Sequence, residues 1–171
     1  FNDDPPAGES RITDWPGFAG ELAEAVRIVR DGAPNALVGG CACDFSPDRN
    51  LQRVLEPVAH RLDFLAYQEM RAASSSEAAA PGYLDVGQSA VDYARYLQQS
   101  FGKPVLLAYV AVSSWGGWEK RQAEALAGLA RERRSLRRAG VFGVVYFQLR
   151  DDPEHEGYFG PAEKHFGLLD A

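Results

Sequence analysis

The chain is poor in the residues that build redox, metal and membrane sites. Its 171 residues include two cysteines, three histidines and one methionine. Cys41 and Cys43 stand two positions apart in a predicted strand, where side chains share a face but point in parallel, so we expect small buried thiols and no disulfide. Because no second cysteine pair completes a zinc site, we expect no metal, and no motif indicates a cofactor. No apolar run approaches the roughly 20 residues that a membrane span needs.

Positive charge is also scarce. The chain has 18 Lys and Arg against 24 Asp and Glu, a net charge of −6. A nucleic acid or an anionic membrane would require clustered Lys and Arg, so we expect neither as a partner. The one basic run, residues 131–138, lies late in a helical pattern, where positive charge complements the negative end of a helix.

Four apolar runs predict buried parallel strands. Each run is short, almost continuously hydrophobic and entered from a turn signal, as expected for strands that are covered on both faces. The runs are residues 36–43, 64–68, 105–112 and 141–149.

Amphipathic stripes before and between these runs predict helices. The stripes cover residues 18–29, 51–62, 91–101 and 118–139, and a short closing helix follows the last strand. Ser89 is placed to cap the third helix, and Gly140 to end the fourth. Repeated strand–helix units require right-handed crossovers and a parallel sheet.

The spacing of the strands suits either a (β/α)8 barrel or an open doubly wound sheet. An open nucleotide-binding sheet usually carries a glycine-rich turn after a strand, but Gly39 and Gly40 lie inside the first strand and no P-loop pattern is present. We therefore predict one domain, residues 1–171, of the barrel type, with the open sheet as the alternative.

Three stretches carry a resemblance to a known family. Residues 1–5 (FNDDP) look like an Asn-Glu-Pro motif at the end of a strand, and residues 102–109 (GKPVLLAY) look like a Gly-Lys-Pro start of one. Residues 157–159 (GYF) and 165–170 (HFGLLD) follow the last strand. Together they resemble the C-terminal half of clan A glycoside hydrolases, the cellulase-like superfamily of TIM barrels. The resemblance implies that the four strands are the fifth to eighth of a barrel that hydrolyses or binds a β-linked oligo- or polysaccharide.

The chain departs from this family at both catalytic positions. The family's acid/base Glu corresponds to Asp3, and its nucleophilic Glu corresponds to Tyr109, with no carboxylate until Glu119. A retaining glycosidase needs two carboxyl groups about 5–5.5 Å apart. The alternative function is therefore a catalytically degraded barrel that binds a saccharide without cleaving it, or serves as a scaffold.

Active sites of βα barrels gather at the carboxyl ends of the strands. From these positions we predict catalytic carboxyl groups among Asp3, Glu69 and Asp44. Glu69 directly follows an apolar strand, where burial would raise its pKa into the range of a general acid. Its alternative role is that of a solvated loop acid or a partner of Arg71 or Arg150, and that of Asp44 is a helix cap.

Polar and aromatic residues at the same ends predict contacts with a sugar. Strand alternation puts Tyr146, Gln148 and Arg150 on one face, which we expect to line the lumen. Trp115 and Trp118 lie in loops, where they would stack on sugar rings or plug the barrel mouth. The predicted substrate-binding residues are Asn2, Tyr67, Tyr109, Trp115, Trp118, Gln148 and Arg150.

Four parallel strands cannot close a barrel, because two strand edges would keep unpaired N–H and C=O groups. We therefore expect an N-terminal half barrel, or a second copy of the chain, as a partner. The chain starts with Phe1 and shows no signal-peptide pattern, so we expect it to belong to something longer. The sequence does not indicate the glycan, its linkage or the cellular compartment.

Overall fold

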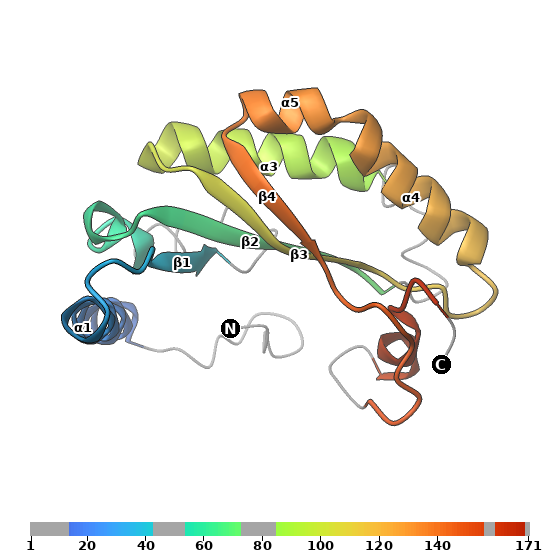
Figure 1. Cartoon of the computed structure of the whole chain (residues 1–171), viewed down its shortest axis with the longest axis horizontal. Helices are drawn as coiled ribbons and strands as arrows, with labels where there is room; N and C mark the ends of the chain where they lie inside the picture. The colour runs from blue at the N-terminus through green and yellow to red at the C-terminus, as the bar shows by residue number, and fades with distance from the viewer. Residues whose placement is uncertain (1–13, 43–53, 73–84, 156–159, 170–171) are drawn as a thin grey trace.

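A four-stranded parallel sheet forms the centre of the chain (Figure 1). This computed structural model describes residues 14–42, 54–72, 85–155 and 160–169. The strands are β1 (Gly39–Ala42), β2 (Phe64–Arg71), β3 (Val105–Val112) and β4 (Val141–Tyr146), in the spatial order β1-β2-β3-β4. An open doubly wound sheet is defined by a reversal in strand order. The order here has no reversal among these strands, which favours the predicted barrel.

Three strands differ in length from the sequence prediction. β1 is shorter than residues 36–43, β4 stops at Tyr146, and β2 continues past Gln68 to Arg71. β2 can continue because Glu69 and Arg71 pair with each other, so that two charged side chains can be buried within the strand. Glu69 is therefore a residue of the strand interior and not of the loop that follows it.

The expectation of two unpaired cysteines is wrong, because Cys41 is disulfide-bonded. β1 ends at Ala42, so the parallel geometry that we assumed for side chains two apart in a strand does not extend beyond it. Cys43 itself lies outside the described residues.

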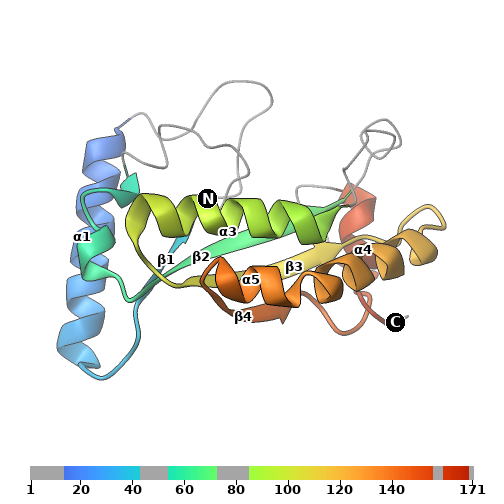
Figure 2. The same ribbon diagram turned by 90° about the horizontal axis from the view of Figure 1, so that it is seen from above.

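Helices cover one face of the sheet (Figures 1 and 2). α3 (Val86–Phe101), α4 (Glu119–Arg131) and α5 (Arg133–Arg138) lie over this face, and α1 (Trp15–Gly32) lies at the β1 side. Two short 3-10 helices, η1 (Ala59–Arg61) and η2 (Gly160–His165), complete the described elements. None of the helices in these ranges is long and apolar enough to cross a membrane.

The helix predictions for residues 18–29, 91–101 and 118–139 are confirmed in position but not in detail. The side chain of Asp85 accepts a hydrogen bond from the Gln88 N–H at 3.1 Å, so α3 begins one turn earlier than predicted and Ser89 lies inside it. The predicted fourth helix divides at Glu132 into α4 and α5, and Gly140 ends it with a positive φ of 85°. The second stripe, where described, forms no regular helix beyond a single turn and η1.

The core lies between the sheet and the helices, and a smaller apolar cluster lies on the other face. In β2 the side chains of Leu65 and Tyr67 pack in the main core, which includes residues of α3. Met70 belongs to the second cluster with Tyr109 and Phe166. Alternation along β2 thus separates a helix-facing side from a side that corresponds to the lumen of a barrel.

Candidate functional site

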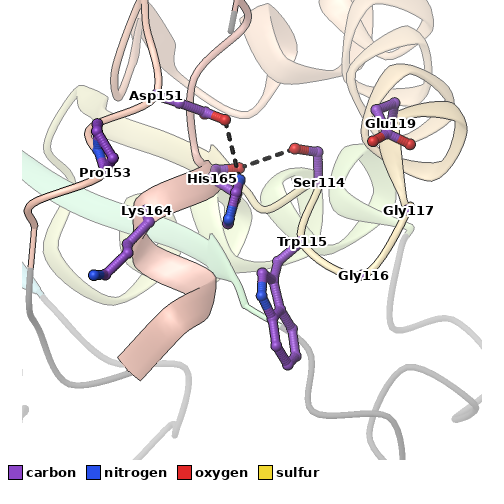
Figure 3. A pocket seen from close by; sticks show the side chains of 9 residues that line it. All are labelled: Ser114, Trp115, Gly116, Gly117, Glu119, Asp151, Pro153, Lys164 and His165. Carbon is purple, nitrogen blue, oxygen red and sulfur yellow. Dashed lines mark hydrogen bonds and ion pairs between the residues drawn. The ribbon is translucent and has the colours of Figure 1, made fainter. Parts of the chain in front are cut away.

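A pocket of about 440 Å³ lies at the carboxyl ends of β3 and β4 (Figure 3). It is formed by the loop after β3, the segment after β4 and η2. Its lining residues are Ser114, Trp115, Gly116, Gly117, Glu119, Asp151, Pro153, Lys164 and His165. The lining combines one large aromatic ring with side chains of both charges.

The loop after β3 holds Trp115 at the mouth of this pocket. The Ser113 hydroxyl donates to the Ala162 carbonyl at 2.7 Å and accepts from the Trp115 N–H at 3.1 Å. Gly116 and Gly117 follow with φ values of 79° and 81°, which glycine adopts without strain. The Trp115 ring is held by a fixed backbone and remains 44% exposed.

The opposite wall depends on Asp151. One carboxylate oxygen accepts from the Gly167 N–H at 2.7 Å, and the other lies 3.1 Å from Nδ1 of His165. A Cβ atom at Gly167 would approach the Asp151 nitrogen to 2.1 Å, so only glycine permits this contact. Asp151 therefore fastens the closing segment of the chain to the segment after β4.

Ser114, His165 and Asp151 do not form a nucleophilic triad. The Ser114 hydroxyl donates to the main-chain carbonyl of His165 at 3.3 Å, not to its imidazole (Figure 3). A serine nucleophile requires its base within hydrogen-bond reach of the hydroxyl. The contact of Ser114 with His165 is therefore structural. In the described ranges, no group of three or more His, Cys, Asp or Glu residues is placed to hold a metal ion.

No protein-family model and no curated protein sequence matches this chain, but solved structures do. A hyperthermophilic β-glucosidase mutant matches 92% of this chain and 44% of its own, with a TM-score of 0.61 and 10% identity. An endo-β-1,4-mannanase from Thermotoga petrophila matches 95% of this chain and 38% of its own, with a TM-score of 0.58 and 15% identity. A family 51 α-L-arabinofuranosidase from Bifidobacterium longum matches 81% and 35%, with a TM-score of 0.54 and 12% identity. The chain has the fold of part of a glycoside hydrolase barrel.

The predicted half barrel and the predicted resemblance to clan A glycoside hydrolases are thus confirmed at the level of the fold. The chain spans less than half the length of these three structures. In the half barrel, the pocket lies where (β/α)8 enzymes gather their active sites, at the carboxyl ends of the strands.

Glu69 and Tyr67 share a face of β2, as alternation predicts, but this face of the half barrel packs against α3. Glu69 is 0% exposed, and its carboxylate accepts from Arg71, the pairing given above as its alternative role. Burial raises the pKa of Glu69 to about 7, against the charge of Arg71 and a hydrogen bond from Ser89. The Tyr67 ring lies 4.4 Å from that of Tyr93 on α3. Neither Glu69 nor Tyr67 lines the pocket.

Tyr146 faces the helices of the half barrel, so its predicted position in the lumen is wrong. Its hydroxyl donates to the Phe166 carbonyl at 3.0 Å and lies 3.5 Å from Nε2 of Gln122 on α4. Burial raises the pKa of this hydroxyl. The polar atom that indicated a lumen position is instead satisfied by the Phe166 carbonyl of the closing segment and by Gln122 of α4.

Tyr109 lies on the lumen side of the half barrel, with its ring 5.2 Å from that of Phe147. Gln148 follows Phe147 across a cis peptide bond. Arg150 is exposed and forms a parallel bridge with Leu169. The Trp118 ring lies 4.3 Å from the Arg121 guanidinium and is not part of the pocket lining. The remaining predicted residues lie outside the described residues: Asn2, Asp3 and Asp44.

Sequence reasoning missed the wall formed by Asp151 and His165. Asp151 stands before a proline turn, and His165 is 14 positions away, so each has an ordinary local role when considered alone. The one available signal was Gly167, a glycine within the closing motif that requires a close backbone approach.

Proposed function

We propose that this chain is one half of a carbohydrate-active barrel and binds a β-linked oligo- or polysaccharide at the pocket beside Trp115. The observation that carries this proposal is the exposed Trp115 ring at the carboxyl end of a glycosidase-type half barrel. A sugar ring presents an apolar C–H face that can stack on an indole ring, while its hydroxyl groups hydrogen-bond to charged side chains. Glu119, Asp151 and Lys164 offer such partners around the ring.

Replacing Trp115 with Ala is expected to weaken saccharide binding about 10-fold or more, because a buried indole contact dominates the interfaces in which it occurs. Isothermal titration with cellopentaose and mannopentaose measures the loss. Trp118→Ala is the matched control, since the Trp118 ring already lies against Arg121. Equal affinity in the parent protein and in Trp115→Ala would contradict the proposal, as would an absence of binding to any oligosaccharide in the parent.

Hydrolysis is the second candidate. One observation favours it, because burial raises the pKa of Glu69 to about 7, the range that a general acid needs at neutral pH. The fully buried position of Glu69 beneath α3, outside the pocket, opposes it. The carboxyl pair would come from Asp3, Glu69 and Asp44, with Tyr109, Gln148 and Arg150 orienting the sugar. In that case Glu69→Gln and Asp3→Asn each abolish release of reducing sugar but leave saccharide binding in place. If the parent binds the saccharide without hydrolysing it, and neither substitution changes the affinity, the chain is a catalytically degraded barrel that only binds the saccharide.

The partner follows from the open edges of the half barrel. β1 and β4 each pair with a single neighbour in the described sheet. Phe142, Val144 and Val145 of β4 are 57%, 46% and 49% exposed, an unusual accumulation of large apolar side chains on an edge strand. We infer that an N-terminal half barrel covers this edge, with a second copy of the chain as the alternative occupant.

A further inference from the structure

The outer surface of α5 is strongly positive in a chain that is acidic as a whole. Residues 131–138 contain five arginines and one glutamate, a net charge of +4, while the whole chain carries −6. Leu136 and Ala139 are buried in the main core, so they fix which side of the helix faces inward. The arginines are all exposed, and helical spacing places them on the opposite side. We call these five residues the arginine surface: Arg131, Arg133, Arg134, Arg137 and Arg138.

No acidic side chain neutralises the arginine surface. In the part of the chain that the structure describes, no carboxylate lies within 4.0 Å of any of the five guanidinium groups. The glutamate of the run, Glu132, is half-buried and lies one turn before Leu136, on the inner side of the helix. On α1, by contrast, Arg27 contacts both Glu24 and Asp31. The arginine surface is therefore an array of cations without counterions.

The charge at a helix end accounts for only part of this array. Positive charge is stabilised by the helix dipole within the last turn, which contains Arg137 and Arg138. Arg133 and Arg134 lie in the first turn of α5, where this stabilisation is absent. They also precede Arg137 and Arg138 by four positions, and like charges at this spacing repel each other. An anionic ligand would remove this repulsion.

The arginine surface is separate from the Trp115 pocket. α5 ends directly before the first residue of β4, whereas the pocket lies at the carboxyl ends of β3 and β4 (Figures 1 and 2). The two features therefore lie at opposite ends of β4. Because the arginines point away from the core, a ligand bound to them lies outside the helix layer and not in the lumen of the half barrel.

The spacing of the arginines favours a polymer whose charges are spread along its length. A guanidinium group binds a carboxylate through two parallel hydrogen bonds. The run extends for about 10 Å along the helix, which is too long for one small anion, and residues four apart are separated by about 6 Å. This separation is close to the length of one sugar unit in an extended polysaccharide. Duplex DNA carries about one charge per 1.7 Å, and the rest of the chain, with a net charge of −10, would repel so dense a polyanion.

We propose that the arginine surface binds an acidic polysaccharide in which successive sugar units carry a carboxylate. This inference rests on the proposed carbohydrate function for its choice of ligand and adds to it a second contact site. Arg133 and Arg137 contact carboxylates that lie one sugar unit apart, and Arg134 and Arg138 form a parallel row beside them. The arginine surface anchors the protein to its polymer, while the Trp115 pocket contacts an individual sugar ring.

Glutamine substitutions test this site because they remove the charge but keep a residue that favours helices. The probes are a hexasaccharide of β-1,4-linked mannuronate and neutral mannohexaose, which share a backbone and differ in charge. The double variant Arg133→Gln/Arg137→Gln is expected to bind the mannuronate hexasaccharide about 10-fold more weakly or worse. Its affinity for mannohexaose should not change. Isothermal titration measures both affinities, and raising NaCl from about 50 to about 200 mM should weaken only the mannuronate complex.

Arg27→Gln/Arg61→Gln is the matched control. Both arginines are exposed and lie away from α5, on α1 and in η1, so this double variant changes the net charge of the chain by the same amount. Its affinity for the mannuronate hexasaccharide should equal that of the parent. An equal loss in both double variants would mean that only net charge matters, and would overturn the inference. The melting temperature of Arg133→Gln/Arg137→Gln should not fall, since the substitutions relieve repulsion, so a loss of affinity is not a loss of folding.

The remaining outcomes separate this inference from the proposed function. If the parent binds mannohexaose at Trp115 but does not bind the mannuronate hexasaccharide, only this inference is overturned. If the parent binds the mannuronate hexasaccharide through Arg133 and Arg137 but does not bind mannohexaose, the proposed function of the Trp115 pocket fails and the arginine surface stands. Tighter binding of an oligouridylate than of the mannuronate hexasaccharide would identify a nucleic acid as the partner and overturn the inference.

Discussion

Lowering the pH from about 8 to about 4.5 is expected to stabilise this protein by about 3 kcal/mol through Glu69 alone. The pKa of Glu69 is raised from 4.5 to about 7 in the folded state, mainly because burial penalises the carboxylate. A raised pKa means that the folded chain binds the proton more tightly than the unfolded chain. The contribution is therefore complete below pH 4.5 and is lost as the pH rises through 7.

Urea unfolding of Glu69→Gln across this range measures the effect. The side chain at position 69 of the variant cannot titrate. Between pH 8 and pH 4.5 the free energy of unfolding of the variant should therefore rise by about 3 kcal/mol less than that of the parent. Glu24→Gln is the control, because Arg27 lowers the pKa of Glu24 and places its titration below this window. Parallel slopes for the parent and Glu69→Gln would show that the carboxyl group is not sealed beneath α3.

The second large effect concerns the open edge. Purified alone, the chain is expected to associate or aggregate at micromolar concentration, because β4 exposes unpaired backbone groups beside Phe142, Val144 and Val145. Val144→Lys should shift most of the material to a species of 18.7 kDa, since an inserted lysine is a common protection of natural edge strands. Size-exclusion chromatography with light scattering gives the masses.

Ala127→Lys tests whether added charge alone is responsible. Ala127 is exposed on α4, away from the edge of the sheet, so its substitution should leave the association of the parent unchanged. A parent protein that elutes as a stable monomer at high concentration would remove the need for a covering half barrel. If the parent forms a defined dimer that Val144→Lys disrupts, the occupant is the second copy.

The fold was accessible from the sequence because its signals are local. Continuous apolar runs mark the four strands, and stripes at helical spacing mark α1, α3 and the α4–α5 pair. The predicted strand boundaries were wrong where a contact that the local sequence does not reveal allows a residue to be buried. A charged residue such as Glu69 normally ends a buried strand, but Arg71 two positions later and Ser89 on α3 compensate its burial.

The candidate site was less accessible for the same reason. Tyr146 has a polar atom at a lumen-like position in the sequence, and only the folded chain shows that this atom contacts the Phe166 carbonyl, 20 residues later, and Gln122, 24 residues earlier. Likewise, the pairing of Asp151 with His165 and Gly167 arises when the chain returns after η2. Trp115 was identified from the sequence because an aromatic residue in a loop at the carboxyl end of a strand indicates a ligand contact without knowledge of any other residue.

The return of the chain after η2 has a mechanical consequence for the pocket. Phe166 is fully buried, and the Leu168 and Leu169 N–H groups both donate to the Leu149 carbonyl at 3.1 Å. The Ser113 and Ser114 hydroxyls, directly before Trp115 in the chain, are anchored to carbonyls of η2. Residues 160–169 therefore hold the loop that carries Trp115 in place. A fusion partner, a truncation or a protease that loosens these residues would displace the Trp115 ring, about fifty residues earlier in the chain.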